Sequence, residues 1–194
     1  MKKCMILVAT TVLSVSAFWG WTEEAAKPSP APERKRAVPR KALPRSKVMS
    51  KSELLRFIPA PPKGWTAPKP TSKTQRVSAF AVTQVTRVFR KGRQQITFIL
   101  EDLGTNNPYF YMDPWKPLEK KTPEKYTKKL MLGKIAAEET YNKEKKQGLI
   151  FLVFEKRIQL NVSGSRVEDT SVLVELAKKV NFKELKEALE ESAK

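Results

Sequence analysis

Histidine is absent from the 194 residues of this chain, and cysteine occurs once, as Cys4. Without histidine there is no Ser-His-Asp or Cys-His catalytic site and no imidazole metal ligand. If the leader around Cys4 is removed, the chain also lacks a disulfide, a thiolate nucleophile and a thiolate-bound zinc. The GxxxxGK[ST] and GxGxxG patterns of phosphate-binding loops are missing as well. We therefore expect no catalytic residue, no metal and no cofactor, and a protein that is not an enzyme.

The start of the chain has the pattern of an export signal. Two lysines precede an apolar run over residues 5–13, and Val15-Ser16-Ala17 resembles an A-x-A cleavage site. This order predicts a signal peptide, residues 1–17, that is cleaved after Ala17. The alternative is an uncleaved anchor that continues through Trp21 and just reaches the length of a membrane-spanning helix. Both interpretations predict a periplasmic or secreted location, or an inner-membrane anchor with the chain facing the periplasm.

Residues 18–49 are expected to form a disordered, basic, proline-rich tether. Ten of the 14 prolines lie between Pro28 and Pro70, and residues 27–76 carry 14 Lys and Arg against two acidic residues. Such a segment buries too little apolar surface to offset the entropy that ordering would cost. Residues 27–76, which extend beyond the tether into the folded domain, therefore carry +12 of the formal net charge of +18.

Two functions fit the charge of the tether. Its basic residues either bind an anionic polymer (acidic lipid, polysaccharide or nucleic acid) or keep a spacer solvated and extended. The candidate polymer-binding residues are Arg34, Lys35, Arg36, Arg40, Lys41, Lys120 and Lys121. The last two belong to a lysine-rich stretch, residues 116–129, whose interleaved glutamates also suit a solvated face. The export signal argues against nucleic acid as the partner.

Residues 50–194 are expected to form one α+β domain: an antiparallel sheet of about five strands with two C-terminal helices packed on it. Ser50 and Glu53 have the spacing of a capping box and predict a short helix. Gly92 lies between two stretches rich in Val, Ile and Phe, which predicts a hairpin. One or two further strand segments are expected in residues 130–141.

The C-terminal part of this domain has the clearest periodicity. The continuous apolar run 148–154 predicts a central strand that is covered on both faces. Residues 157–163 alternate between apolar and polar, with Arg157 among the side chains expected to face solvent. Helical spacing of apolar residues then predicts two helices that pack on the sheet, one capped by residues 170–171 and one by Asn181.

Residues 106–115 are the candidate ligand site. Tyr109, Tyr111 and Trp115 lie here in a stretch dense in aromatic residues and bounded by prolines. Such side chains stack on a sugar or a quinone ring, or insert at a membrane interface. The alternative is that they fold back as a lid over the edge of the core.

The segment Ile58–Trp65, with Pro-Pro-Lys-Gly-Trp at its end, resembles the Pro-Pro-x-Gly-Trp entry of a family of uncharacterised exported bacterial proteins. Arg87–Gly92, Ile158–Gly164 and Val180–Leu185 are similar to a hairpin, a strand and the closing helix of that family. The resemblance covers about residues 55–189. It implies a periplasmic α+β domain and carries over no catalytic residue. Trp65 is expected to pack on the sheet, with stacking on a ligand as the alternative.

These features favour a non-enzymatic exported envelope protein, whose folded domain binds an envelope protein or a small ligand. The alternative is a protein that binds anionic polymers through the tether and the lysine-rich stretch. The sequence indicates no oligomeric state.

Overall fold

Eight antiparallel strands and three helices make up the part of the chain that the computed structural model describes, residues 46–77, 79–105, 107 and 119–193. The strands are β1 (Thr71–Val77), β2 (Phe80–Lys91), β3 (Gln94–Asp102), β4 (Lys120–Lys121), β5 (Lys125–Leu132), β6 (Ile135–Asn142), β7 (Gln147–Phe154) and β8 (Ile158–Ser165). The helices are α1 (Lys51–Leu55), α2 (Ser171–Lys178) and α3 (Phe182–Ala193). The predicted combination of an antiparallel sheet with two C-terminal helices is confirmed.

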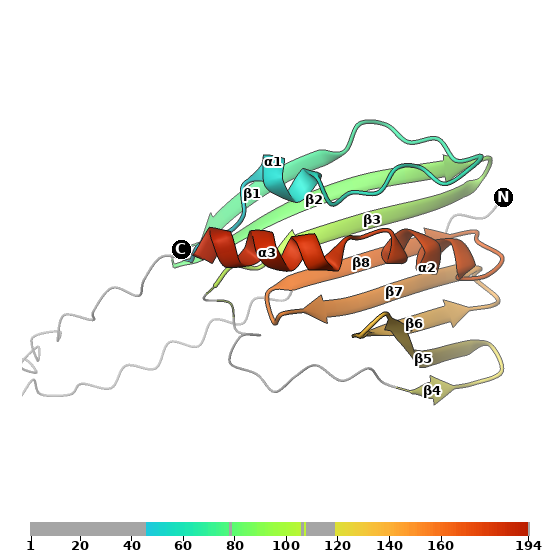
Figure 1. The fold of residues 1–194 in the computed structure, drawn as a ribbon. Coiled ribbons are helices and arrows are strands. Elements are labelled where there is room, and N and C mark those ends of the chain that lie inside the picture. The colour runs from blue at the N-terminus through green and yellow to red at the C-terminus, as the bar shows by residue number, and fades with distance from the viewer. Residues whose placement is uncertain (1–45, 78, 106, 108–118, 194) are drawn as a thin grey trace, which may run out of the picture. The chain divides into compact units, whose positions relative to one another are not determined.

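The sheet consists of two meanders that meet at its centre. β1, β2 and β3 pair in sequence, and so do β4 to β8. β8 then pairs with β3, which gives the order β1-β2-β3-β8-β7-β6-β5-β4 (Figure 1). Two strands that lie more than fifty residues apart in the sequence are therefore neighbours in the middle of the sheet.

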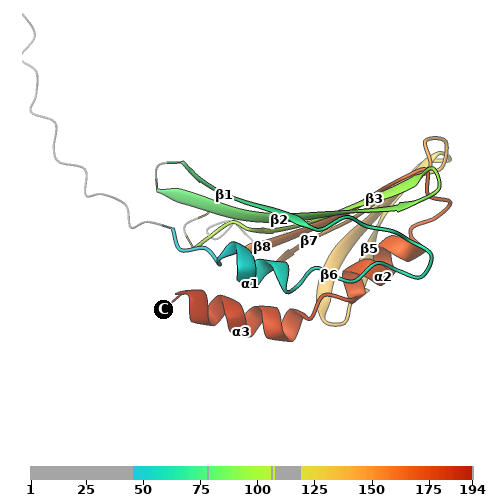
Figure 2. The ribbon, with the colours of Figure 1, turned by 90° about the horizontal axis from the view of Figure 1, so that it is seen from above.

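All three helices lie on one side of the sheet (Figure 2). The fully buried core residues beneath them include Phe89, Ile96, Phe98, Leu100, Ile150, Leu152, Ile158, Leu160 and Val162. α2 and α3 add Leu173, Leu176 and Leu185 to this core. Because side chains alternate along a strand, the intervening residues lie on the opposite face. No helix of the described part covers that face, and we call it the helix-free face.

The prediction of about five strands is wrong, because the sheet has eight. The segments expected in residues 130–141 correspond to the end of β5 and to β6, whereas the polar strands β1 and β4 and the first half of β5 were missed. β1 reads TSKTQRV at one edge, and β5 reads KYTKKLML beside the two lysines of β4 at the other. An edge strand has a neighbour on one side only and is often protected from aggregation by charged residues, especially lysine. The apolar alternation that marks a strand is therefore weak in these segments.

The apolar run 148–154 forms the predicted central strand, β7, and the helices of the described part cover one of its two faces. Gly148, Ile150 and Leu152 are buried under the helices. Leu149, Phe151 and Val153 lie on the helix-free face, where they are half-buried. β7 pairs with β8 on one side and with β6 on the other.

The central hairpins turn where the sequence predicts, with one correction. Gly92 has a φ of 56° between β2 and β3, and Glu155 and Lys156 have φ values of 50° and 52° between β7 and β8. Positive φ at both Glu155 and Lys156 is the conformation of a type I′ turn, whose twist matches that of the two strands it joins. Asn and Gly are the usual residues of this turn. Arg157 follows this turn and does not face solvent as predicted: it is 5% exposed, because it pairs with a buried carboxylate.

Side-chain caps stabilise two of the three helices. At α1, Ser50 and Glu53 form the predicted capping box. The backbone N–H of Glu53 donates to Ser50 Oγ at 3.3 Å, and the backbone N–H of Ser50 donates to Glu53 Oε2 at 2.7 Å. At α3, the side chain of Asn181 accepts the N–H of Glu184 at 3.2 Å. The cap predicted at residues 170–171 does not form: Thr170 begins α2, but its hydroxyl donates to Glu139 and makes no capping hydrogen bond. Among the described residues, no helix has the length and apolar character needed to cross a membrane.

Candidate functional site on the helix-free face

The helix-free face is hollowed over β3, β8, β7 and β6, with a volume of about 660 Å³. Most of the lining side chains are uncharged amides and hydroxyls: Gln95, Thr97, Thr140, Asn142, Gln147, Asn161, Ser163 and Ser165. Ile99 and Leu149 add apolar surface, and Lys125 and Lys145 add positive charge. Every charged residue of this described lining is thus a lysine.

Cross-strand register arranges the lining in straight rows. The first row runs through Lys125, Asn142, Gln147, Ser165 and Gln95, one residue from each of five adjacent strands. A second row runs through Thr127, Thr140, Leu149, Ser163 and Thr97. With strands about 4.8 Å apart, each row is about 19 Å long. The hollow therefore presents parallel lines of hydrogen-bonding groups across the strands.

Sequence reasoning missed this site for a physical reason. Its residues come from strands spread over residues 94–165, and none of them belongs to a local motif. The available signal was the alternation in β8, where Gln159, Asn161 and Ser163 are the polar positions. That alternation predicts that one face of β8 is exposed to solvent. Only the register of the sheet shows which polar side chains of the other strands lie beside Gln159, Asn161 and Ser163.

A second polar cluster surrounds Glu139 on the helix-covered face. Glu139 is 4% exposed, and its Oε1 accepts hydrogen bonds from the hydroxyls of Tyr126 and Thr170, each at 2.7 Å. Lys128 Nζ lies 3.2 Å from the same oxygen and 5.2 Å from the centroid of the Tyr126 ring. The Thr170 hydroxyl is thus directed to β6, which ties the start of α2 to the sheet.

The electrostatics of this cluster keep Glu139 ionised. Burial raises the pKa of its carboxyl, but hydrogen bonds from Thr170, Tyr126 and Lys128 outweigh burial and hold the pKa below the ordinary 4.5. Burial, followed by the hydrogen bond to Glu139, raises the pKa of Tyr126 above 10.0. The Glu139 carboxylate interacts with donors from β5 and from the start of α2 and so connects these elements to β6. We therefore assign this cluster a structural role.

Glu139→Gln is expected to lower the free energy of unfolding by about 1–3 kcal/mol at pH 7, since an amide accepts these donors less strongly. Because the folded-state pKa lies below 4.5, the stability from Glu139 is present above that pH and is lost as the pH falls through the folded value. Urea denaturation of both proteins between pH 7 and pH 3 should show the difference shrinking toward acid. An equal difference at both ends would contradict this account.

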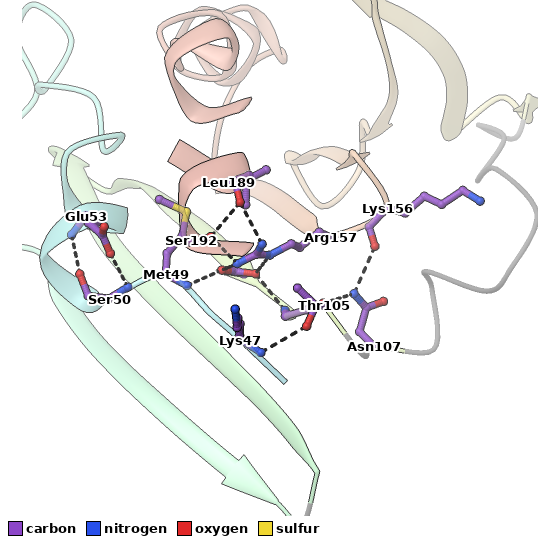
Figure 3. A network of polar contacts seen from close by, with 12 residues as sticks. Lys47, Met49, Ser50, Glu53, Thr105, Asn107, Lys156, Arg157, Leu189 and Ser192 are labelled. Carbon is purple, nitrogen blue, oxygen red and sulfur yellow. Dashed lines mark hydrogen bonds and ion pairs between the residues drawn. The ribbon is translucent and has the colours of Figure 1, made fainter. Parts of the chain in front are cut away.

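A buried ion pair joins the end of β3 to the turn before β8 (Figure 3). Arg157 donates from Nε and Nη2 to the two carboxylate oxygens of Asp102, each at 2.7 Å. Asp102 is fully buried and also accepts the backbone N–H groups of Met49 at 2.6 Å and Gly104 at 2.9 Å. The carboxylate therefore has four donors, and the guanidinium is held in a bidentate geometry.

The same pair ties both ends of the domain to the sheet. Arg157 donates to the Leu189 carbonyl near the end of α3 at 3.3 Å and to the Ser192 hydroxyl at 2.9 Å. On the other side, Met49 is 1% exposed and Ser46 is 2% exposed. The packed domain thus includes residues 46–49, which the sequence analysis assigned to the tether. We assign the Asp102–Arg157 pair a structural role as a clamp.

The structure describes three of the residues predicted to form sites. Trp65 is half-buried and packs against the core, beside the bridge between Thr66 and Arg90. Lys120 and Lys121 are exposed on β4, where they line a shallow pocket with Tyr126 and Lys128. Trp65 and the two lysines therefore lie toward opposite edges of the sheet and do not form one site.

The remaining predicted site residues lie outside the described residues. They are Tyr109, Tyr111, Trp115, Arg34, Lys35, Arg36, Arg40 and Lys41. Within the described ranges, no group of three or more Asp, Glu, His or Cys side chains is placed to bind a metal ion.

Comparisons with known proteins were made for the whole chain. No protein-family model, no curated protein and no solved structure matches it. The resemblance to exported bacterial proteins therefore stays a prediction from the motifs, and the function is argued from the geometry.

Proposed function

We propose that the protein is a non-enzymatic, exported binding protein whose domain binds a carbohydrate in the hollow of the helix-free face. The observation that carries this proposal is the lining of amide and hydroxyl side chains set out in cross-strand rows. Amides and hydroxyls each offer both donors and acceptors, which matches the hydroxyl groups of a sugar. The rows favour an elongated ligand, such as an oligosaccharide, over a compact one.

The scaffold and the chemistry of the hollow both support binding. Side chains on paired strands are held in place by the hydrogen-bonded ladder, so less order has to be imposed when a ligand binds. General acid–base catalysis is most efficient with a group whose pKa lies near the working pH, and amides and aliphatic hydroxyls do not supply one. The export signal proposed for residues 1–17 would deliver the domain to the compartment that holds envelope polysaccharides.

Gln147→Leu tests this proposal, because it keeps the size of a side chain in the first row and removes its hydrogen bonds. We expect at least one member of a panel of chitotetraose, cellotetraose and tetragalacturonic acid to bind the full-length protein. The variant should bind that ligand about two- to tenfold more weakly by calorimetry, the range for one or two lost hydrogen bonds.

Gln159→Leu is the matched control. Gln159 lies on the same face of the sheet, but it is outside the hollow lining. Its replacement should leave the affinity unchanged. Equal losses in the two variants, or no binding by any member of the panel, would contradict the proposed site.

A second candidate function is the binding of an anionic polymer through the tether and the lysine-rich edge. It is favoured by the lysines of β4 and β5, of which Lys128 alone has an ion pair within the described residues. Such binding would weaken steeply with salt, because it is driven by counterion release. Removal of residues 27–45, which leaves the packed residues 46–49 in place, would also weaken it strongly. Carbohydrate binding in the hollow would survive that deletion.

A further inference from the structure

We infer that the ligand of the hollow is an acidic glycan, a chain of sugar units that carries several carboxylates. This inference rests on the proposed carbohydrate-binding function and adds the charge of the ligand. It is carried by Lys125 and Lys145 in the lining and by Arg90, which lies outside the lining, just beyond the other end of the first row.

The first row begins at Lys125, and Arg90 lies one strand beyond its other end. Beyond Gln95, the register places Arg90 of β2 next in line, and Arg90 is exposed on the same face. Lys125 and Arg90 are thus separated by five strand spacings, or about 24 Å. One small anion cannot contact both, so the cations match a ligand with anionic groups along its length.

The surroundings of the row favour negative charge in the ligand. Lys145 joins Lys125 in the lining. Of the other charged residues in its turn, Lys146 pairs with Glu168 at 2.9 Å, and Lys143 and Glu144 offset each other. The nearest carboxylates on the strands of this face are Glu138 and Glu101, which lie two and three rows farther along. At about 6.8 Å per row, these carboxylates are about 14 and 20 Å away from the first row.

The hydrogen-bonding groups between the cations identify the rest of the ligand. Asn142, Gln147, Ser165 and Gln95 are uncharged and would meet the hydroxyls between successive carboxylates. The Asn142 side-chain oxygen already accepts the backbone N–H of Lys145 at 2.9 Å, which leaves its amide N–H₂ for a ligand. A flexible polyanion without hydroxyls would match these uncharged side chains poorly. A chain of uronic acid units presents both kinds of group in alternation.

The test compares two ligands that share a backbone, tetragalacturonic acid and its fully methyl-esterified, neutral form. Calorimetry with the full-length protein at low salt should give the acid about tenfold higher affinity than the ester, as expected for two or more exposed ion pairs. In the variant Lys125→Gln/Lys145→Gln, the affinity for the acid should fall about tenfold, and the affinity for the ester should not change.

Lys134→Gln/Lys183→Gln is the matched control, since it removes the same net charge at exposed positions outside the lining. It should bind both ligands as the wild type does. Equal affinity for acid and ester, with no effect of Lys125→Gln/Lys145→Gln, would overturn the acidic ligand and leave the carbohydrate site standing. An equal loss in both double variants would show that binding follows net charge, which overturns the assignment to the hollow. Concentration-dependent dimerisation through this face would overturn it as well.

Discussion

An Asp102→Asn variant is expected to lose about 3–5 kcal/mol of unfolding free energy, the cost of breaking a buried ion pair from one side. The side chain of Asp102 is fully buried, and that of Arg157 is 6% exposed. Asparagine keeps the shape but removes the charge, so the guanidinium stays buried without compensation. It also directs an amide N–H₂ at groups that are themselves donors. Guanidinium denaturation followed by circular dichroism measures the loss.

Two comparisons make this result specific. Glu144→Gln removes a carboxylate from an exposed turn and should change stability by no more than about 0.5 kcal/mol. Asp102→Leu combined with Arg157→Met removes both charges and should recover only part of the loss. An apolar pair avoids the cost of desolvating the ions, but it leaves the backbone N–H groups of Met49 and Gly104 without their acceptor. A loss below about 1 kcal/mol in Asp102→Asn, within the range of an exposed pair, would contradict the clamp.

Leu173→Ala is expected to cost about 2–5 kcal/mol, since it leaves a cavity beneath α2. Leu173 is fully buried and lies over Gly148 of β7 and Gly164 of β8, which are cross-strand partners. A Cβ added to Gly148 would lie 2.7 Å from Leu173 Cδ1, and one added to Gly164 would lie 3.0 Å from Leu173 Cδ2. The two glycines thus let the helix approach the sheet closely.

This packing predicts a coupling between the helix and the sheet. Gly148→Ala alone should cost about 1–3 kcal/mol through the close contact with Leu173. In the Leu173→Ala background the added methyl group gains space, so the double variant should be about 0.5–3 kcal/mol more stable than the sum of the single losses. Val174→Ala, at the neighbouring half-buried position, should cost less than Leu173→Ala. Strictly additive losses would show that Leu173 does not rest on Gly148.

The elements that the sequence predicted best are those whose signal is local. The capping box of α1 lies within four residues, and Gly92 lies in the turn that it predicts. Ile158, Leu160 and Val162 alternate on a half-buried strand and are buried as expected. In each case, one short segment contains both the pattern and its cause.

The candidate site could not be predicted in this way. The sequence directed attention to aromatic residues and to runs of lysine, because both stand out locally. Gln95, Asn142 and Gln147 are ordinary polar residues in three different strands, and they become neighbours only through the pairing of β3, β8, β7 and β6. Arg157 was misplaced for a related reason: its buried partner, Asp102, is 55 positions earlier in the chain.

The sequence by itself determined the α+β class, the two C-terminal helices, the central hairpins and the caps of α1 and α3. These depend on periodicity, turn residues and capping side chains, whose effects reach only a few residues along the chain. Only the tertiary structure decided that β8 pairs with β3, that polar segments extend the sheet at both edges, and that amides, hydroxyls and lysines from separate strands line one hollow. Paired strands are joined by backbone hydrogen bonds, which nearly every residue can form. The identity of the side chains therefore predicts only weakly which strands pair.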